Sequence, residues 1–182
     1  MRKQIVTLFA VGALNWAMPA FSGEIHEAAA SGDLERVKAL LKASPNLVSS
    51  RDTNGMTALH CAVSQGHSDM TKLLLANKAD VNAKANGDGG GTALHMAVGG
   101  GKKDIAALLL ADKADVNAGD KRGHTPLGIA AVTGKKDMAQ LLLAFDADVN
   151  AKDGSGWTAL HTAVSFKRDS VVELLRQQGG HD

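Results

Sequence analysis

Residues 78–83 read Lys-Ala-Asp-Val-Asn-Ala, and the same six residues occur again at 113–118. A variant that begins with Asp146 in place of the lysine occupies residues 146–151. The copies start 35 and 33 residues apart in a chain of 182 residues. A phrase that returns at a nearly constant interval of this length is typical of chains built from repeated structural units, so this stretch decides the fold.

A second phrase repeats in step with the first one. Each copy contains a threonine, at Thr57, Thr92, Thr125 or Thr158, and the copies read MTALHCAVSQGH, GTALHMAVGGGK, HTPLGIAAVTGK and WTALHTAVSFKR. The segment EIHEAAASGD at 24–33 fits the same frame without the threonine. The sequence therefore predicts five units, at about residues 23–51, 52–84, 85–119, 120–152 and 153–180.

Each unit has the apolar pattern of two short helices. In the second unit, two groups of apolar residues at the helical spacing i, i+3, i+4 flank Gly66. These groups are Leu59, Ala62 and Val63, then Met70, Leu73 and Leu74. Helices of this length are not stable alone in water, whereas stacked units bury one another's apolar faces. The predicted fold class is all-α, a solenoid of five stacked helix-turn-helix units.

The pattern TALHxAVxxGH…LLLxxxADVNA at a period near 33 resembles the ankyrin repeat over residues 24–180. The resemblance implies β-hairpin-like loops between the helix pairs and a slightly curved stack. It implies a structural role for the repeated Thr and His side chains, which would hydrogen-bond around the turn. It also implies that partner proteins bind the hairpin tips and the ends of the first helices, on the concave side.

Two departures from the ankyrin pattern carry expectations of their own. Lys78, Lys113 and Asp146 stand where ankyrin repeats usually have glycine before ADVN, which would cost about 1 kcal/mol each if the backbone there is left-handed. The third unit has two extra residues within 86–91, so we expect its hairpin to be longer and looser than the others.

The first 22 residues have the layout of a secretory signal peptide. Arg2 and Lys3 are basic, residues 5–18 are mostly apolar, and small residues occupy Ala20 and Ser22. We expect cleavage after Ser22, a mature chain of 23–182 in the periplasm or secreted, and no membrane span after cleavage. An uncleaved anchor is the alternative, although the apolar run is short of the roughly 20 residues that span a bilayer.

No pattern points to a cofactor, a metal or a catalytic set. The histidines that share one repeat position (His26, His60, His95 and His161) would lie about 8–10 Å apart on stacked helices and could not share an ion. The glycine-lysine pairs lack the rest of a phosphate-binding loop. The net charge of +1 gives no basic field for nucleic acid. Cys61, the single cysteine, lies in an apolar helical pattern, so we expect a buried and inert thiol.

A further column, His67, Lys102, Lys135 and Arg168, is basic. It could meet an acidic partner, but the neighbouring acids favour a solvated face of mixed charge.

The fourth and fifth units carry the candidate partner-binding residues. Aligning the units places Trp157 at a hairpin tip and Phe166 at the end of a first helix, on the concave side, and large aromatic side chains often anchor interfaces. The alternative for Trp157 is that it packs on its neighbouring hairpin. The full candidate set is Lys121, Arg122, His124, Val132, Thr133, Trp157, Ser165 and Phe166.

These observations predict a non-enzymatic, monomeric module of the cell envelope that docks another protein on a preformed concave face. The resemblance to exported bacterial ankyrin proteins implies an inhibitor, a toxin-immunity protein or a stress-protection adaptor. An alternative is a secreted effector that binds a host protein. An enzyme or a small-ligand binder is disfavoured, because packing accounts for the residues of every unit.

Overall fold

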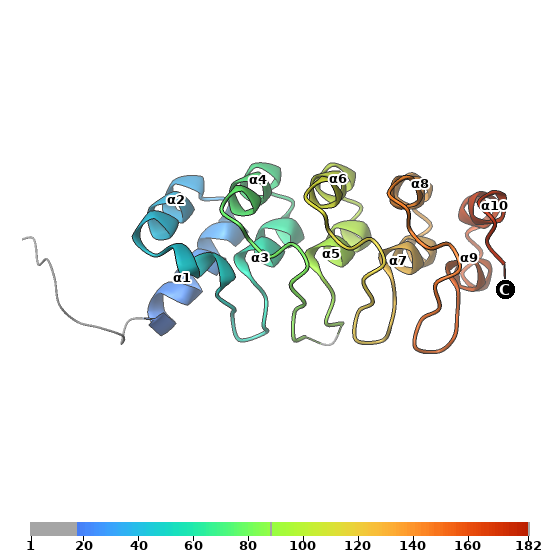
Figure 1. The fold of residues 1–182 in the computed structure, drawn as a ribbon, viewed down its shortest axis with the longest axis horizontal. Coiled ribbons are helices and arrows are strands. Elements are labelled where there is room, and N and C mark those ends of the chain that lie inside the picture. Colours follow the sequence, from blue (N-terminus) through green and yellow to red (C-terminus); the bar gives the residue numbers. More distant parts are fainter. Residues whose placement is uncertain (1–17, 88, 182) are drawn as a thin grey trace, which may run out of the picture.

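The computed structural model describes residues 18–87 and 89–181, with side chains from Gly23 onward. The α-helices of the described residues form five pairs. Figure 1 shows the pairs standing side by side in a row, so the predicted all-α solenoid is confirmed. The helices of this part of the chain are α1 (Met18–Ser31), α2 (Leu34–Ala43), η1 (Pro45–Ser49), α3 (Ala58–Gln65), α4 (Ser68–Ala76), α5 (Ala93–Gly100), α6 (Lys103–Ala111), α7 (Pro126–Thr133), α8 (Lys136–Ala144), α9 (Ala159–Ser165) and α10 (Asp169–Gln177).

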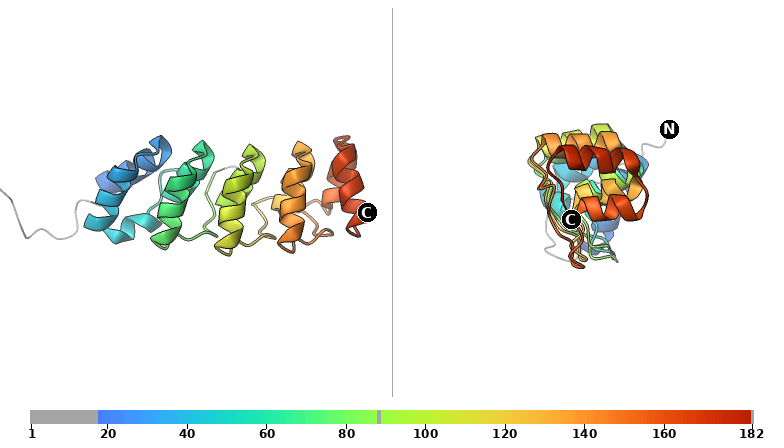
Figure 2. Two further views of the ribbon diagram at one scale, coloured as in Figure 1. Left: turned by 90° about the horizontal axis from the view of Figure 1, so that it is seen from above. Right: turned by 90° about the vertical axis from the view of Figure 1, so that its right-hand side faces the viewer.

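The helices form two layers. The first helices of the units (α1, α3, α5, α7 and α9) pack on one another in sequence, and the second helices do the same. Figure 2 shows the second helices as a parallel series from above, and its end-on view superposes the units along the stack. Each unit therefore contacts chiefly its two neighbours, which is the arrangement that makes the repeats one another's core.

The second unit shows how the repeated phrase forms its helices. The Thr57 side chain and the backbone N–H of Thr57 both meet His60 Nδ1, at 2.9 and 3.2 Å, and this reciprocal cap starts α3. Gly66 ends the helix in a left-handed conformation with φ of 86°. Leu59, one of the predicted inward residues, is fully buried. Apart from Cys61, the described hydrophobic core consists of Leu, Ala, Val, Ile and Met side chains, whereas Phe145, Trp157 and Phe166 are exposed.

The residues that replace the usual glycine do adopt left-handed backbone. Lys78, Lys113 and Asp146 have φ of 66°, 67° and 63°. Lys167 has φ of 53° at the place where Gly66 and its equivalents end the first helix. L-residues other than Gly, Asn and Asp rarely adopt this conformation, so the three lysines are strained positions.

Three of the hairpins are organised by an aspartate. Asp52, Asp120 and Asp153 each accept hydrogen bonds from the backbone N–H groups two and four residues later, at 2.8–3.0 Å. The third hairpin has Gly87 at this position, which has no side chain that could accept these bonds. Its own backbone supplies a bridge between Lys84 and Thr92 instead.

Asparagine side chains of the three ADVNA phrases tie the second, third and fourth units to the segment that follows each of them. Asn82 Oδ1 accepts a hydrogen bond from the N–H of Asp115 at 2.8 Å, and Asn117 Oδ1 accepts one from Asp148 at 2.8 Å. Asn150 repeats the contact with His181 at 3.1 Å. The repeated asparagine is therefore a link between units, a role that its recurrence alone did not reveal.

The basic column lies at least partly in solvent among exposed acids, and three of its side chains also bond to the backbone of the preceding unit. His67 Nε2 lies 2.9 Å from the carbonyl of Ala30, Lys135 Nζ donates to Gly99 at 2.7 Å, and Arg168 Nε donates to Val132 at 2.9 Å. Each of these bonds reaches the end of the first helix of the preceding unit, where backbone carbonyls lack helical partners. These three residues therefore help to hold neighbouring units together.

Residues 1–17 of the predicted signal peptide lie outside the described residues, and α1 begins at Met18, before the predicted cleavage point. No helix in the described part of the chain combines the length and the apolar character that a membrane span requires.

Candidate protein-binding groove

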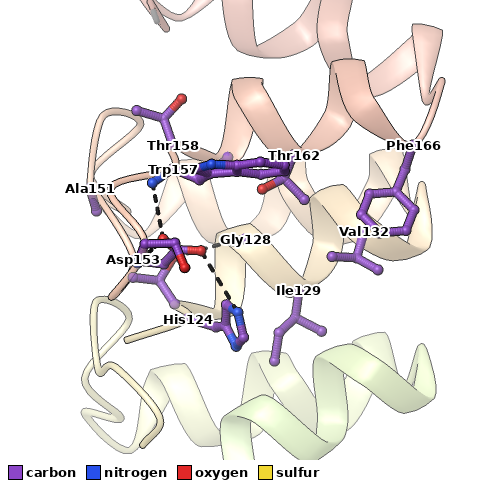
Figure 3. A pocket seen from close by; sticks show the side chains of 13 residues that line it. His124, Gly128, Ile129, Val132, Ala151, Asp153, Trp157, Thr158, Thr162 and Phe166 are labelled. Atoms are coloured by element: carbon purple, nitrogen blue, oxygen red, sulfur yellow. Dashed lines mark hydrogen bonds and ion pairs between the residues drawn. The ribbon is translucent and has the colours of Figure 1, made fainter. Parts of the chain in front are cut away.

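A groove of about 520 Å³ opens between α7, α9 and the hairpins of the fourth and fifth units. Figure 3 shows it with Trp157 on one side and His124 and Ile129 on the other. We call it the 4/5 groove. It is lined by His124, Thr125, Gly128, Ile129, Val132, Ala151, Asp153, Ser155, Trp157, Thr158, Ala159, Thr162 and Phe166.

Trp157 lies where the fifth hairpin leads into α9. Its backbone N–H donates to Asp153 Oδ1 at 3.0 Å, which fixes the start of the side chain. The indole stacks on the His161 ring, with centroids 5.8 Å apart and planes 26° apart, and 43% of the residue is exposed. A large aromatic surface is thus held in place on its own unit while much of it faces solvent.

Phe166 and Val132 form the apolar end of the groove. Phe166 is 50% exposed and Val132 is 36% exposed, and Figure 3 shows the two side chains facing each other from neighbouring units. Ile129 lies one helical turn before Val132, and Thr162 lies one turn before Phe166. The helical repeat therefore continues the apolar lining from these two residues into the groove.

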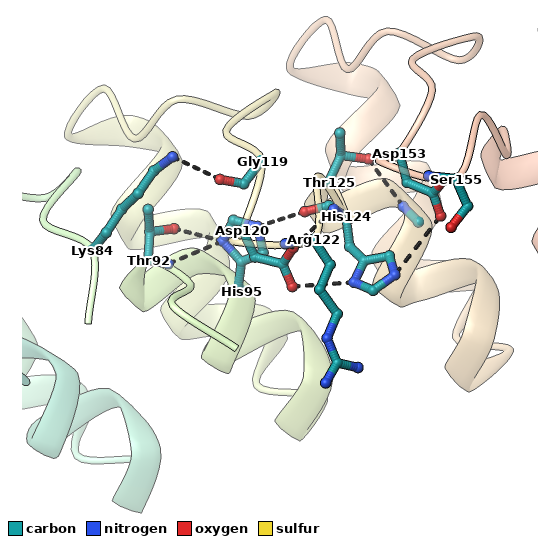
Figure 4. Close-up of polar contacts among 11 residues, drawn as sticks. Lys84, Thr92, His95, Gly119, Asp120, Arg122, His124, Thr125, Asp153 and Ser155 are labelled. Atoms are coloured by element: carbon teal, nitrogen blue, oxygen red, sulfur yellow. Dashed lines mark hydrogen bonds and ion pairs between the residues drawn. The ribbon is translucent and has the colours of Figure 1, made fainter. Parts of the chain in front are cut away.

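The hairpin end of the groove is polar. His124 Nδ1 is 3.1 Å from Asp120 Oδ2, and His124 Nε2 is 3.7 Å from Asp153 Oδ2 in the next hairpin (Figure 4). Burial raises the pKa of Asp120, but hydrogen bonds from the backbone of His124 and Arg122 and from the His124 side chain outweigh it and leave this pKa below its usual value. The histidine joins two neighbouring hairpins at the edge of the groove.

The structure brings together four of the eight predicted site residues, His124, Val132, Trp157 and Phe166. The other four do not line the groove. Lys121 Nζ donates to the carbonyls of Asn86 and Gly87 in the preceding hairpin, so this side chain links the third and fourth hairpins. Thr133 Oγ1 donates to the Ile129 carbonyl at 2.9 Å within its own helix. Arg122 and Ser165 are exposed.

Sequence reasoning missed Ile129, Thr162, Gly128 and Asp153. The first two could have been found, because each lies on the same helix face as a residue that was selected. Asp153 was not predicted as a groove residue because an aspartate at its position in the repeat is expected in the turn, where it accepts hydrogen bonds from its own hairpin.

Two of the repeated histidines, His60 and His95, have the structural role that the resemblance implied. Thr57 pairs with His60, and Thr92 Oγ1 lies 2.8 Å from His95 Nδ1. His95 Nε2 then contacts the carbonyl of His124 in the next unit at 3.0 Å. His161 differs, because it is exposed and stacks on Trp157.

Two histidines are kept neutral by burial, which lowers the pKa of His60 and of His95. His60 Nε2 forms no hydrogen bond in the described structure, although the Gly91 carbonyl lies close enough to oppose part of the pKa shift.

Cys61 is buried, as expected, and burial raises the pKa of its thiol to about 11. A thiol with this pKa is protonated at neutral pH and is a poor nucleophile. Among the described residues no cluster of three or more His, Cys, Asp or Glu side chains could hold a metal ion.

The stacked helix pairs define a helical repeat protein that carries an exposed groove on its fourth and fifth units. The family described as "Ankyrin repeats (3 copies)" matches residues 25–120 and 114–182. The chain belongs to the ankyrin-repeat family.

Curated relatives match part of the chain. Protein phosphatase 1 regulatory subunit 27 of Mus musculus is 42% identical over 71 residues, which are 39% of this chain and 45% of that protein. The Homo sapiens counterpart is 41% identical over the same length. Ankyrin repeat domain-containing protein 13C of Danio rerio is 37% identical over 60 residues, which are 33% of this chain and 12% of that protein. The matches thus span less than half the length of these relatives.

Proposed function

We propose that the protein is a non-enzymatic module that binds another protein in the 4/5 groove. The observation that carries this proposal is the exposure of Trp157, Phe166 and Val132 around one groove in a molecule whose other large apolar side chains are mostly buried. Aromatic side chains that are held rigidly and remain exposed are the usual anchors of protein interfaces. The regulatory-subunit name of two relatives is consistent with a role exerted through binding.

The groove favours docking with little rearrangement. Its walls are two helices that pack on each other, and its hairpins are held by the carboxylates of Asp120 and Asp153. A preorganised surface loses little conformational entropy on binding, so the contact energy of the anchors appears as affinity.

The test is capture of a partner by the protein, followed by measurement of the affinity for the captured protein. Trp157→Ala combined with Phe166→Ala should weaken binding at least about tenfold, since truncating hot-spot residues costs about 2 kcal/mol or more. Met56→Ala combined with Gln65→Ala removes the equivalent positions of the second unit and should change the affinity less than about twofold. Circular dichroism must show native helix content in both variants.

Two outcomes would contradict the groove proposal. One is loss of binding in the Met56/Gln65 variant with full binding in the Trp157/Phe166 variant, which would place the site in the second unit. The other is unfolding caused by Trp157→Ala and Phe166→Ala, which would make these side chains part of the core. Assaying the partner's own activity with and without the protein then separates inhibition or immunity from an adaptor role in stress protection.

We further propose that the mature protein acts in the periplasm or after secretion. The basic, apolar and small-residue pattern of residues 1–22 supports this, because it is the pattern that export machinery removes. Mass spectrometry of the protein from producing cells should show a new N-terminus at Gly23. Recovery of the full-length chain from membranes would contradict the proposal.

A further inference from the structure

The charge that lines the 4/5 groove is negative. Asp153 is the one acidic residue among the described residues that line it, and its side chain is only 15% exposed. No lysine or arginine is among these lining residues, and Lys121, Arg122 and Lys152, which are close to His124 and Asp153 in the sequence, do not line the groove. A largely buried carboxylate in a groove without basic side chains favours a cationic guest.

Asp153 uses one of its two oxygens to hold its own hairpin. Oδ1 accepts hydrogen bonds from the backbone N–H groups of Ser155 and Trp157, at 2.8 and 3.0 Å. Oδ2 lies 3.7 Å from His124 Nε2, which is longer than a hydrogen bond. Oδ2 therefore retains the capacity to accept a hydrogen bond from a guest in the groove.

The tautomer of His124 leaves a second acceptor at the same place. Burial raises the pKa of Asp120, but the hydrogen bonds it accepts leave this pKa below its usual value, so the carboxylate is ionised at neutral pH and can only accept. His124 Nδ1, 3.1 Å from Asp120 Oδ2, must then carry the proton of the neutral ring. His124 Nε2 is left as an acceptor that faces Asp153 Oδ2 (Figure 4). Two acceptors in this position suit a guest that offers several N–H donors.

Trp157 adds a flat aromatic surface beside these acceptors. Figure 3 shows the indole edge-on, with Asp153, His124 and Ile129 together on one side of the ring plane. A guanidinium stacks on an indole face and presents a planar fork of N–H donors at its own edge. A lysine ammonium is a compact, strongly hydrated charge, so it matches an aromatic face with two acceptors less well.

We propose that the 4/5 groove recognises an arginine of its partner protein together with an apolar side chain close to that arginine in the partner's sequence. The guanidinium bonds to Asp153 and His124 and lies against the indole of Trp157. The apolar side chain packs on Phe166 and Val132 at the other end of the groove. This inference rests on the proposed function of the groove in binding a protein, and it adds the chemistry of the segment that is bound.

The probe is a library of short random peptides displayed on phage and selected on the full protein. Peptides that also bind the Trp157→Ala, Phe166→Ala double variant are removed, so that the remaining ones require the groove. These should carry an arginine near an apolar residue. In a synthetic copy of a selected peptide, citrulline in place of the arginine keeps the shape and removes the charge, and it should weaken the affinity at least about tenfold.

Asp153→Asn makes the matching change in the protein. Its amide oxygen can still accept the N–H groups of Ser155 and Trp157, whereas its NH₂ group replaces the free Oδ2. The variant should weaken the arginine peptide at least about tenfold and change the affinity of the citrulline peptide less than about twofold. Asp52→Asn is the control, because Asp52 Oδ1 accepts the same two backbone bonds in the second hairpin. It should leave both affinities within about twofold, and circular dichroism should stay native in both variants.

The outcomes separate this inference from the proposed function. Peptides that require the groove but carry no arginine, or that tolerate citrulline, would overturn the inference and leave the proposed function standing. Lysine peptides that bind as tightly as arginine peptides would overturn the assignment to a guanidinium. Selection of no peptide that requires Trp157 and Phe166 would overturn both proposals.

Discussion

At the scale of single residues, the backbone angle of a few positions limits stability. Lys113 has a φ of 67°, which costs an L-residue about 1–2 kcal/mol, whereas glycine adopts it freely. Part of the gain from glycine is lost because a glycine makes the unfolded chain more flexible, by about 0.5–1 kcal/mol. The three lysines in this conformation are therefore places where the fold tolerates a residue that it does not prefer.

We expect Lys113→Gly to raise the free energy of unfolding by about 0.5–1 kcal/mol in urea titrations. Asp146→Gly should raise it less, since aspartate tolerates left-handed backbone better than lysine. Gln140→Gly, on the exposed side of α8, should instead lower it by about 1 kcal/mol. A destabilising effect of Lys113→Gly would show that the lysine side chain matters more than its backbone angle.

The buried histidines make stability depend on pH. Burial lowers the pKa of His60 and His95 in the folded state, whereas both keep a pKa of about 6.5 in the unfolded chain. Above that pH the two histidines are neutral in both the folded and the unfolded protein, so they do not reduce the free energy of unfolding. As the pH falls below it, the unfolded chain binds protons that the folded chain does not, so the free energy of unfolding decreases until the folded pKa values are reached.

Urea titrations between pH 8 and pH 5 should therefore show stability falling by up to about 1.4 kcal/mol per pH unit for each of the two histidines. A double variant, His60→Gln with His95→Gln, should be less stable at pH 8 but should have a flatter pH profile. An equal slope in the variant would assign the pH dependence to other groups.

At the scale of elements, the hairpins differ in how they are held. The fourth and fifth hairpins are held by the carboxylates of Asp120 and Asp153, whereas the third has Gly87 at the equivalent position and contains two extra residues. Lys121 compensates in part, because its ammonium donates to the carbonyls of Asn86 and Gly87. A loop with fewer internal bonds and more glycine opens more easily.

Hydrogen exchange should accordingly be fastest in residues 86–91 and slower in residues 120–124. Lys121→Ala should speed exchange in the third hairpin further and leave the fifth hairpin unchanged. Equal protection of the third and fourth hairpins in the parent protein would refute this ranking.

At the scale of the whole molecule, the two ends of the row are not equivalent. The first unit carries the ion pair of Glu24 and Arg36 at its end of the row, whereas the fifth leaves Val164, Trp157 and Phe166 exposed around or near the 4/5 groove. Among the described residues the exposed large apolar side chains all lie in the last two units, so the proposed 4/5 groove lies in the part of the protein where such surface is concentrated. In a solenoid each unit contacts mostly its neighbours, so exposed apolar side chains in the last two units do not affect the packing of the first three.

The sequence by itself determined the architecture. The interval between the ADVNA phrases, the apolar spacing around Leu59 and the glycine at position 66 are local signals, and local signals suffice when each unit contacts only its neighbours. The strain at Lys78 and the burial of Cys61 also followed from their places in the repeat. Trp157 and Phe166 were found for the same reason, because a repeat alignment places every residue on a known side of its unit.

Only the tertiary structure decided which side chains meet across units. Lys121, selected as a binding residue, reaches back to the third hairpin, and the predicted solvated column of His67, Lys135 and Arg168 bonds to carbonyls of the preceding units. These partners are 34–37 residues away, and the length and rotamer of a side chain decide whether it reaches them or points to solvent. A repeat period fixes where each Cα lies in the stack, but it does not fix where a long flexible side chain ends.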